Sequence, residues 1–132
     1  MEEKIEYNDV SNLIIKEFPD FEIDPLWLDE KELLEYLVAS DFARYIINII
    51  DENNIEKIKK CFKFIELLYL NGTKKTKELA TIGYLEDIQN MTGGNETVEK
   101  YKIINAYLGI ETKKWWDKLN EYWNGNMDAL KE

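Results

Sequence analysis

The sequence predicts an all-α fold, a compact bundle of about six helices in a single domain that spans residues 1–132. Apolar residues recur at intervals of three and four along almost the whole chain, which is the spacing of one helix face. Strand-like alternation is confined to residues 21–24. Connections of a few residues separate most predicted helices, and such short connections favour antiparallel neighbours in a bundle.

The first predicted helix covers residues 8–18 and stops before Pro19. The second covers residues 30–53 and is apolar around most of its circumference, so we expect it to be buried on several sides. Its polar residues form one narrow stripe, made of Asp41, Arg44, Asn48 and Asp51. Because Asp41 and Arg44 are three residues apart on this stripe, we expect them to form an ion pair.

The remaining helices are predicted over residues 55–70, 75–91 and 96–108 and from Thr112 onward, with Thr112 as the N-cap. The first of these has two apolar stripes and should contact two neighbours. Gly83 inside the next indicates a close helix contact. The tryptophans of the last helix are expected in the core. Glycines follow most predicted helix ends, where a left-handed cap favours glycine: Gly72, Gly93, Gly94, Gly109 and Gly125.

The chain has no histidine and one cysteine. The lack of histidine excludes Ser-His and Cys-His nucleophiles and histidine-ligated zinc. Cys61 lies on a helical apolar pattern, so we expect a buried structural thiol. We therefore predict no enzyme activity and no catalytic, cofactor-binding or metal-binding residues. The acidic start and the lack of a long apolar run predict a cytoplasmic protein that does not contact membranes.

One pair of carboxylates suggests a different chemistry. Glu32 and Glu35 are one turn apart on the second predicted helix, as magnesium ligands are in the all-α nucleotide pyrophosphatases that this pair resembles. Those enzymes need a second acidic pair on the facing helix, whereas Glu86 and Asp87 are adjacent and point in different directions. A magnesium-dependent nucleotide hydrolase is therefore an alternative that the residues disfavour.

Charge is distributed unevenly along the chain. Residues 1–56 hold 16 acidic and 4 basic residues, whereas residues 57–132 hold 11 acidic and 13 basic residues. Such asymmetry is typical of an electrostatic docking surface, although acidic residues also keep a small protein soluble. The total charge of −10 argues against a nucleic-acid partner, despite the lysines between residues 57 and 77.

Residues 17–30 are the most distinctive segment, with six acidic residues and no basic residue. Aromatic residues among acids suit an interface with a basic protein partner, where the aromatics anchor and the acids steer the encounter. The alternative is that Phe18, Phe21 and Trp27 hold the segment on the core while the acids face water. The candidate partner-binding residues are Asp20, Glu22, Asp24, Trp27, Asp29 and Glu30.

Four stretches carry a family resemblance: residues 36–45 (YLVASDFARY), 64–68 (FIELL), 79–87 (LATIGYLED) and 115–123 (WWDKLNEYW). Together they resemble a bacterial all-helical family of unknown function, similar to the immunity proteins that neutralise toxins in competition between bacteria. The resemblance spans most of the chain and rests on packing motifs, and no catalytic residue is carried over.

The resemblance implies a protein-binding inhibitor that neutralises a cognate basic toxin, such as a nuclease, by direct binding. An acidic chain without catalytic residues fits the cationic groove of such a toxin. The other interpretation is a helical adaptor with a different protein partner. A neighbouring gene for a large secreted protein with a variable C-terminal domain would favour the inhibitor.

Overall fold

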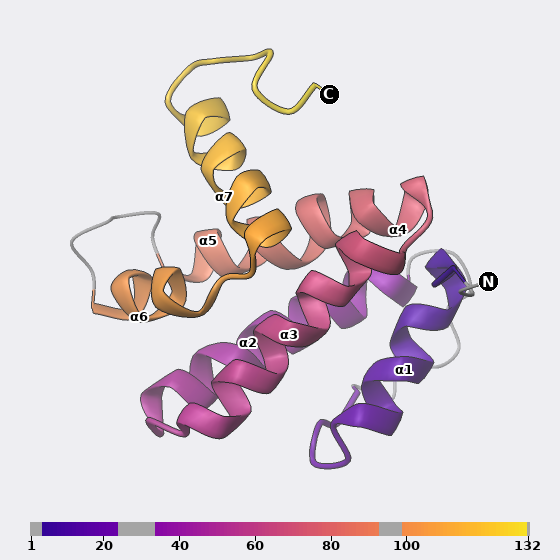
Figure 1. Cartoon of the computed structure of the whole chain (residues 1–132). Coiled ribbons are helices and arrows are strands. Elements are labelled where there is room, and N and C mark those ends of the chain that lie inside the picture. Colours follow the sequence, from indigo (N-terminus) through magenta and orange to yellow (C-terminus); the bar gives the residue numbers. More distant parts are fainter. Residues whose placement is uncertain (1–3, 24–33, 93–98, 132) are drawn as a thin grey trace.

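The computed structural model describes residues 4–23, 34–92 and 99–131, and these residues form an all-α domain, as predicted. Figure 1 shows the helices packed around one another without a sheet. The elements are η1 (Tyr7–Asp9), α1 (Val10–Glu17), α2 (Leu34–Asp51), α3 (Ile55–Asn71), α4 (Lys74–Glu78), η3 (Leu79–Leu85), α5 (Glu86–Thr92), α6 (Glu99–Tyr107) and α7 (Ile110–Trp123). Helical backbone continues from α4 through the π-helical segment η3 into α5, so these three elements form the single fourth helix that the sequence predicts.

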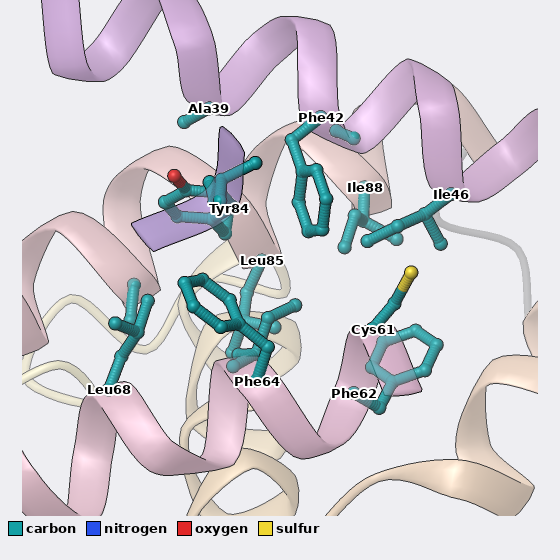
Figure 2. Close-up of a cluster of buried hydrophobic side chains, with 14 of the residues drawn as sticks. Ala39, Phe42, Ile46, Cys61, Phe62, Phe64, Leu68, Tyr84, Leu85 and Ile88 are labelled. Atoms are coloured by element: carbon teal, nitrogen blue, oxygen red, sulfur yellow. The ribbon is translucent and has the colours of Figure 1, made fainter. Parts of the chain in front are cut away.

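The core lies between α2, α3 and the helix that contains η3. Figure 2 shows Phe42 and Ile46 of α2 facing Phe64 of α3 and Tyr84 of η3. Phe42, Ile46 and Tyr84 have no exposed surface, and Phe64 is 6% exposed. The expectation that α2 is buried on several sides is thus confirmed. Cys61 is also buried, as predicted, and this burial raises the pKa of its thiol to about 12.

Gly83 lies where η3 packs closely against α2. A Cβ atom at this position would lie 3.2 Å from the Ala39 Cβ and 3.1 Å from the Leu79 Cδ1. Distances this short are tighter than ordinary side-chain contacts, so a larger residue would push the two helices apart. The predicted close contact is therefore confirmed, and it explains a glycine within a helix that otherwise disfavours it.

The left-handed cap is found at Gly125, whose φ is 107°, but not at Gly72 or Gly109. Gly72 has an extended conformation, and a Cβ there would lie 2.1 Å from the Leu68 carbonyl oxygen. Gly72 also lies beside Ile5 of the N-terminal segment. The Ile5 N–H donates to the Asn71 carbonyl, and the Thr73 N–H donates to the Ile5 carbonyl. The glycine is therefore required by lack of space and not by backbone rotation.

The start of α7 differs from the prediction. Its N-cap is Gly109 and not Thr112, and Glu66 of α3 replaces the missing cap side chain. The Glu66 carboxylate accepts hydrogen bonds from the backbone N–H of Glu111 at 3.2 Å and of Thr112 at 2.8 Å. The Thr112 hydroxyl donates to the same carboxylate at 2.8 Å. Glu66 thereby satisfies donors that a first helical turn leaves free, and it fixes α7 to α3.

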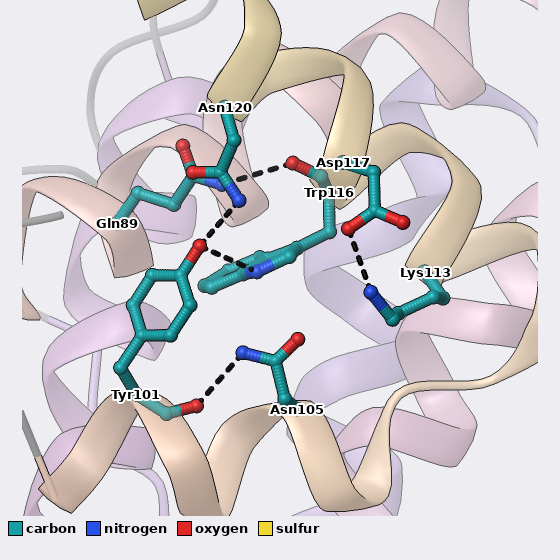
Figure 3. Close-up of polar contacts among 7 residues, drawn as sticks. All are labelled: Gln89, Tyr101, Asn105, Lys113, Trp116, Asp117 and Asn120. Carbon is teal, nitrogen blue, oxygen red and sulfur yellow. Dashed lines mark hydrogen bonds and ion pairs between the residues drawn. The ribbon is translucent and has the colours of Figure 1, made fainter. Parts of the chain in front are cut away.

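Polar contacts hold the other side of α7. Figure 3 shows the Tyr101 hydroxyl accepting a hydrogen bond from the Trp116 indole at 3.1 Å and another from Asn120. The Gln89 side-chain amide of α5 donates to the Trp116 carbonyl at 3.2 Å. Trp116 is fully buried, which confirms its predicted place in the core. Trp123 is 53% exposed, so its predicted core position is wrong, because it lies in the last turn of α7 beyond these contacts.

Replacing Glu66 tests the cap. Glu66→Ala should lower the free energy of unfolding by about 2 kcal/mol, because two backbone donors and one hydroxyl lose their acceptor. Gly109→Ala should also destabilise the protein, since its Cβ would lie 2.4 Å from the Glu66 carboxylate oxygen and displace it. The exposed Glu121→Gln is the control and should change stability by less than about 0.5 kcal/mol. Urea unfolding followed by circular dichroism measures the free energy of unfolding of all three variants. A Glu66→Ala variant as stable as the original protein would contradict the role of Glu66 as a cap.

Candidate partner-binding surface

A groove of about 450 Å³ lies on α2 beside the segment that follows α1. Its walls are formed by residues 21–23 on one side and by the polar stripe of α2 on the other. The described part of the acidic segment and the stripe thus share one surface, although they are about 20 positions apart in the sequence. We call this surface the α2 groove, and it is lined by Phe21, Glu22, Ile23, Asp41, Arg44, Tyr45 and Asn48.

Aromatic packing positions the segment beside α2. Phe18 and Phe21 are 2% and 7% exposed, and their rings meet the Phe42 ring edge-on at 5.0 and 5.4 Å between centroids. The Tyr45 ring stacks on Phe42 with centroids 5.5 Å apart and forms the floor of the groove. For Phe18 and Phe21, the interpretation that the aromatics hold the segment on the core is therefore correct.

Asp20 is not available as an unpaired acid. Its carboxylate forms an ion pair with Lys57 of α3 and accepts a hydrogen bond from the Tyr45 hydroxyl at 2.7 Å. These two hydrogen bonds hold the pKa of Asp20 below its usual range. The lysine is 37 residues away along the chain, so a local count of charges could not reveal the pair. Asp20 therefore anchors the segment to α2 and α3.

Glu22 is the predicted partner-binding residue that the structure places on the groove wall with an exposed side chain. The other predicted residues of this set, Asp24, Trp27, Asp29 and Glu30, lie outside the described residues. Glu22 is two residues before Asp24 in the sequence.

The polar stripe of α2 provides the opposite wall. Arg44 and Asp41 form the predicted ion pair at 3.1 Å, with 62% of the Arg44 side chain and 16% of the Asp41 side chain exposed. Asn48 is exposed on the same wall. Asp51 does not line the groove and instead pairs with Lys100 of α6 at 2.9 Å. Helical spacing predicts this stripe, but no feature of the sequence joins it to residues 21–23.

Glu35, one of the two carboxylates considered as magnesium ligands, is buried and bonded to α1. It is 5% exposed and accepts hydrogen bonds from the Ser11 backbone N–H at 3.1 Å and from the Ser11 hydroxyl at 2.7 Å. Burial raises the pKa of its carboxyl group. Glu32 lies outside the described residues. Within residues 4–23, 34–92 and 99–131, no three His, Cys, Asp or Glu side chains gather where they could hold a metal ion.

Glu86 and Asp87 of α5 lie beside α2 and are half-buried. Burial is the main reason that the pKa of both carboxyl groups is raised, and the pKa of Asp87 reaches about 6. The charge of Glu86 raises the pKa of Asp87 further, while a hydrogen bond with Ser40 opposes the shift. Asp87 lies in a shallow hollow of about 290 Å³ that also includes Ser40 and Gly83.

The pKa of Asp87 predicts a pH dependence of stability. Because the folded-state pKa exceeds the unfolded value, the favourable contribution of the neutral carboxyl is present below about pH 4 and lost as pH rises through about 6. Asp87→Asn removes this loss and can keep accepting the Ser40 hydrogen bond. The variant should be more stable than the original protein by about 1 kcal/mol at neutral pH, after allowance for its half-exposed position, and should show no gain near pH 4.

Urea unfolding at the two pH values measures this difference. Glu121→Gln, an exposed change of the same charge on α7, is the control and should show no such pH-dependent gain. An equal effect of Asp87→Asn at both pH values would show that the folded protein does not perturb the titration of Asp87.

The chain matches a known family over most of its length. A family model described as a domain of unknown function (DUF7674) matches residues 11–124, which include the α2 groove. No curated protein and no solved structure matches the chain. Across the described part of the chain, no helix has the length and apolar character needed to cross a membrane.

Proposed function

The chain belongs to the DUF7674 family, and because that family is defined by a domain of unknown function, we propose a function from its surface. We propose that the protein is an immunity-type inhibitor that binds a basic bacterial toxin domain in the cytoplasm through the α2 groove and the adjoining acidic segment. The toxin is neutralised by occlusion of its cationic substrate site, and no catalytic step by this chain is involved.

The observation that carries the proposal is that residues 21–23 of the acidic segment and Asp41, Arg44 and Asn48 of the α2 stripe line one groove. An interface needs apolar area that a partner can cover and polar groups that fix its orientation. Ile23 and Tyr45 supply half-buried apolar surface, while Glu22 and Arg44 supply exposed charges beside it. Arginine and tyrosine are residue types that often anchor protein interfaces.

Charge supports the basic nature of the partner. Residues 1–56, which form the groove and the acidic segment, carry 16 acidic and 4 basic residues. A field of this sign accelerates encounter with a cationic surface and weakens as salt screens it. Asp20 takes little part in this attraction, because Lys57 neutralises it locally.

Association kinetics test the steering. After a partner is identified by co-purification, the variant that combines Glu22→Gln, Asp24→Asn, Asp29→Asn and Glu30→Gln should associate about tenfold more slowly at low salt. A matched control changes four exposed acids elsewhere to their amides: Glu56, Glu99, Glu121 and Asp128. Both variants have the same net charge, so a slower rate in the first alone shows that position matters. Equal rates for the two variants would remove the acidic segment from the interface.

Dissociation tests the groove itself. Arg44→Ala removes a largely exposed side chain from the middle of the wall and should leave the free energy of unfolding within about 0.5 kcal/mol. Dissociation of the partner should become at least about tenfold faster if Arg44 is an interface anchor. Unchanged dissociation would place the interface away from α2. A partner unrelated to toxins, bound at the same groove, would instead favour the helical adaptor.

A further inference from the structure

A second concave surface lies on another part of the molecule, between the fourth helix, α7 and the C-terminal segment. Figure 1 shows the chain turning back after α7 toward the side on which α4 lies. The pocket enclosed there has a volume of about 390 Å³, within the range of small-molecule sites. It shares no lining residue with the α2 groove. We call it the lysine pocket, because its walls include Lys74, Lys77 and Lys131.

The charge of the lysine pocket is opposite to that of the whole protein. The net charge of the chain is −10, yet the pocket walls hold these three lysines against the single acid Glu78. Lys74 and Lys77 form no ion pair with another described residue. Lys131 pairs with Asp128, but both side chains are more than three-quarters exposed, and exposed pairs of this kind are weak.

The remaining walls are apolar and held in place. Ile82 of η3 is 40% exposed. Trp115, which belongs to α7, also lines the pocket. The Trp115 ring is parallel to the Tyr69 ring at 6.4 Å between centroids, and the Tyr69 hydroxyl shares a 2.7 Å hydrogen bond with Thr81. The Lys118 ammonium lies 4.3 Å from the centre of the Trp115 ring. These contacts restrict the positions that the indole can take, and such restriction lowers the entropic cost of binding.

We propose that the lysine pocket binds a small phosphate monoester whose body carries an apolar ring. Lys74 and Lys77 form no ion pair with another described residue, so two ammonium groups are left for a phosphate monoester, which carries up to two negative charges at neutral pH. The ring of such a ligand covers Ile82 and Trp115 while its phosphate contacts Lys74 and Lys77. The volume and the wall formed by the C-terminal segment suit a compact ligand better than an extended peptide.

Binding of 1-naphthyl phosphate to the full chain tests this inference, with inorganic phosphate and 1-naphthol as probes for each half of the ligand. Isothermal titration calorimetry should give a dissociation constant below about 1 mM for the naphthyl phosphate and at least about tenfold weaker binding for each half. In two-dimensional NMR, the Trp115 indole N–H signal should shift on titration. Binding of inorganic phosphate as tight as that of the naphthyl phosphate would overturn the proposal, because the ring would then contribute nothing.

Paired lysine variants locate the site. Lys74→Gln with Lys77→Gln should weaken naphthyl phosphate binding by at least about tenfold, because both phosphate contacts are lost. The control, Lys59→Gln with Lys63→Gln, removes two exposed lysines of α3 that do not line the pocket and should change affinity by less than about twofold. All four lysines are on the surface of helices, so these changes leave the core intact. Equal losses in the two variants, or no binding to the original protein at about 5 mM ligand, would refute the site.

Discussion

The Phe42 side chain is the contact on which the rest of the arrangement depends. Its ring lies within 6.2 Å, between centroids, of rings from the segment after α1, from α2, from α3 and from η3. The edge-on contacts that dominate this cluster are the favourable geometry for aromatic pairs. Gly83 allows η3 to approach α2 closely enough for Tyr84 to join the cluster. Because Phe21 and Tyr45 belong both to this cluster and to the α2 groove, the core fixes the shape of the candidate binding surface.

Two glutamates cap helices that are far from them in the sequence, so part of the negative charge of this chain stabilises the fold. Glu35 binds the N-terminal turn of α1 through Ser11, and Glu66 binds the first turn of α7 through Glu111 and Thr112. A carboxylate at a helix N-terminus is stabilised by unpaired N–H groups and by the helix dipole. These carboxylates join elements of the fold, as Asp20 does through Lys57. Only part of the negative charge is therefore free to face a partner, and Glu22 is the exposed example on the groove.

Periodicity was enough to predict the all-α class, the burial of α2 and the close contact at Gly83, because each depends on local spacing along a helix. The Asp41–Arg44 pair was predictable for the same reason. Features that depend on residues far apart were missed or wrong: the Asp20–Lys57 pair, the union of residues 21–23 with α2, and the start of α7. Thr112 has the sequence features of an N-cap, but the Glu66 carboxylate comes from another helix and accepts hydrogen bonds from N–H groups of the first turn. The N-cap is therefore Gly109, three residues earlier, and α7 begins at Ile110. A single sequence contains no local signal for such a contact.

The uneven charge along the chain becomes an uneven charge in space, and this bears on how two binding surfaces can coexist. The first 56 residues include α1 and every residue that lines the α2 groove, whereas the lysine pocket is lined wholly by residues 74–131. The Asp20–Lys57 and Asp51–Lys100 ion pairs join the first 56 residues to the rest of the chain. If a basic protein binds the groove as proposed, the lysine pocket would repel it, so the same field that steers it would also orient it. If the proposed anionic ligand occupies the pocket, it would reduce that repulsion, and the two proposed sites would then be linked electrostatically without a change of shape.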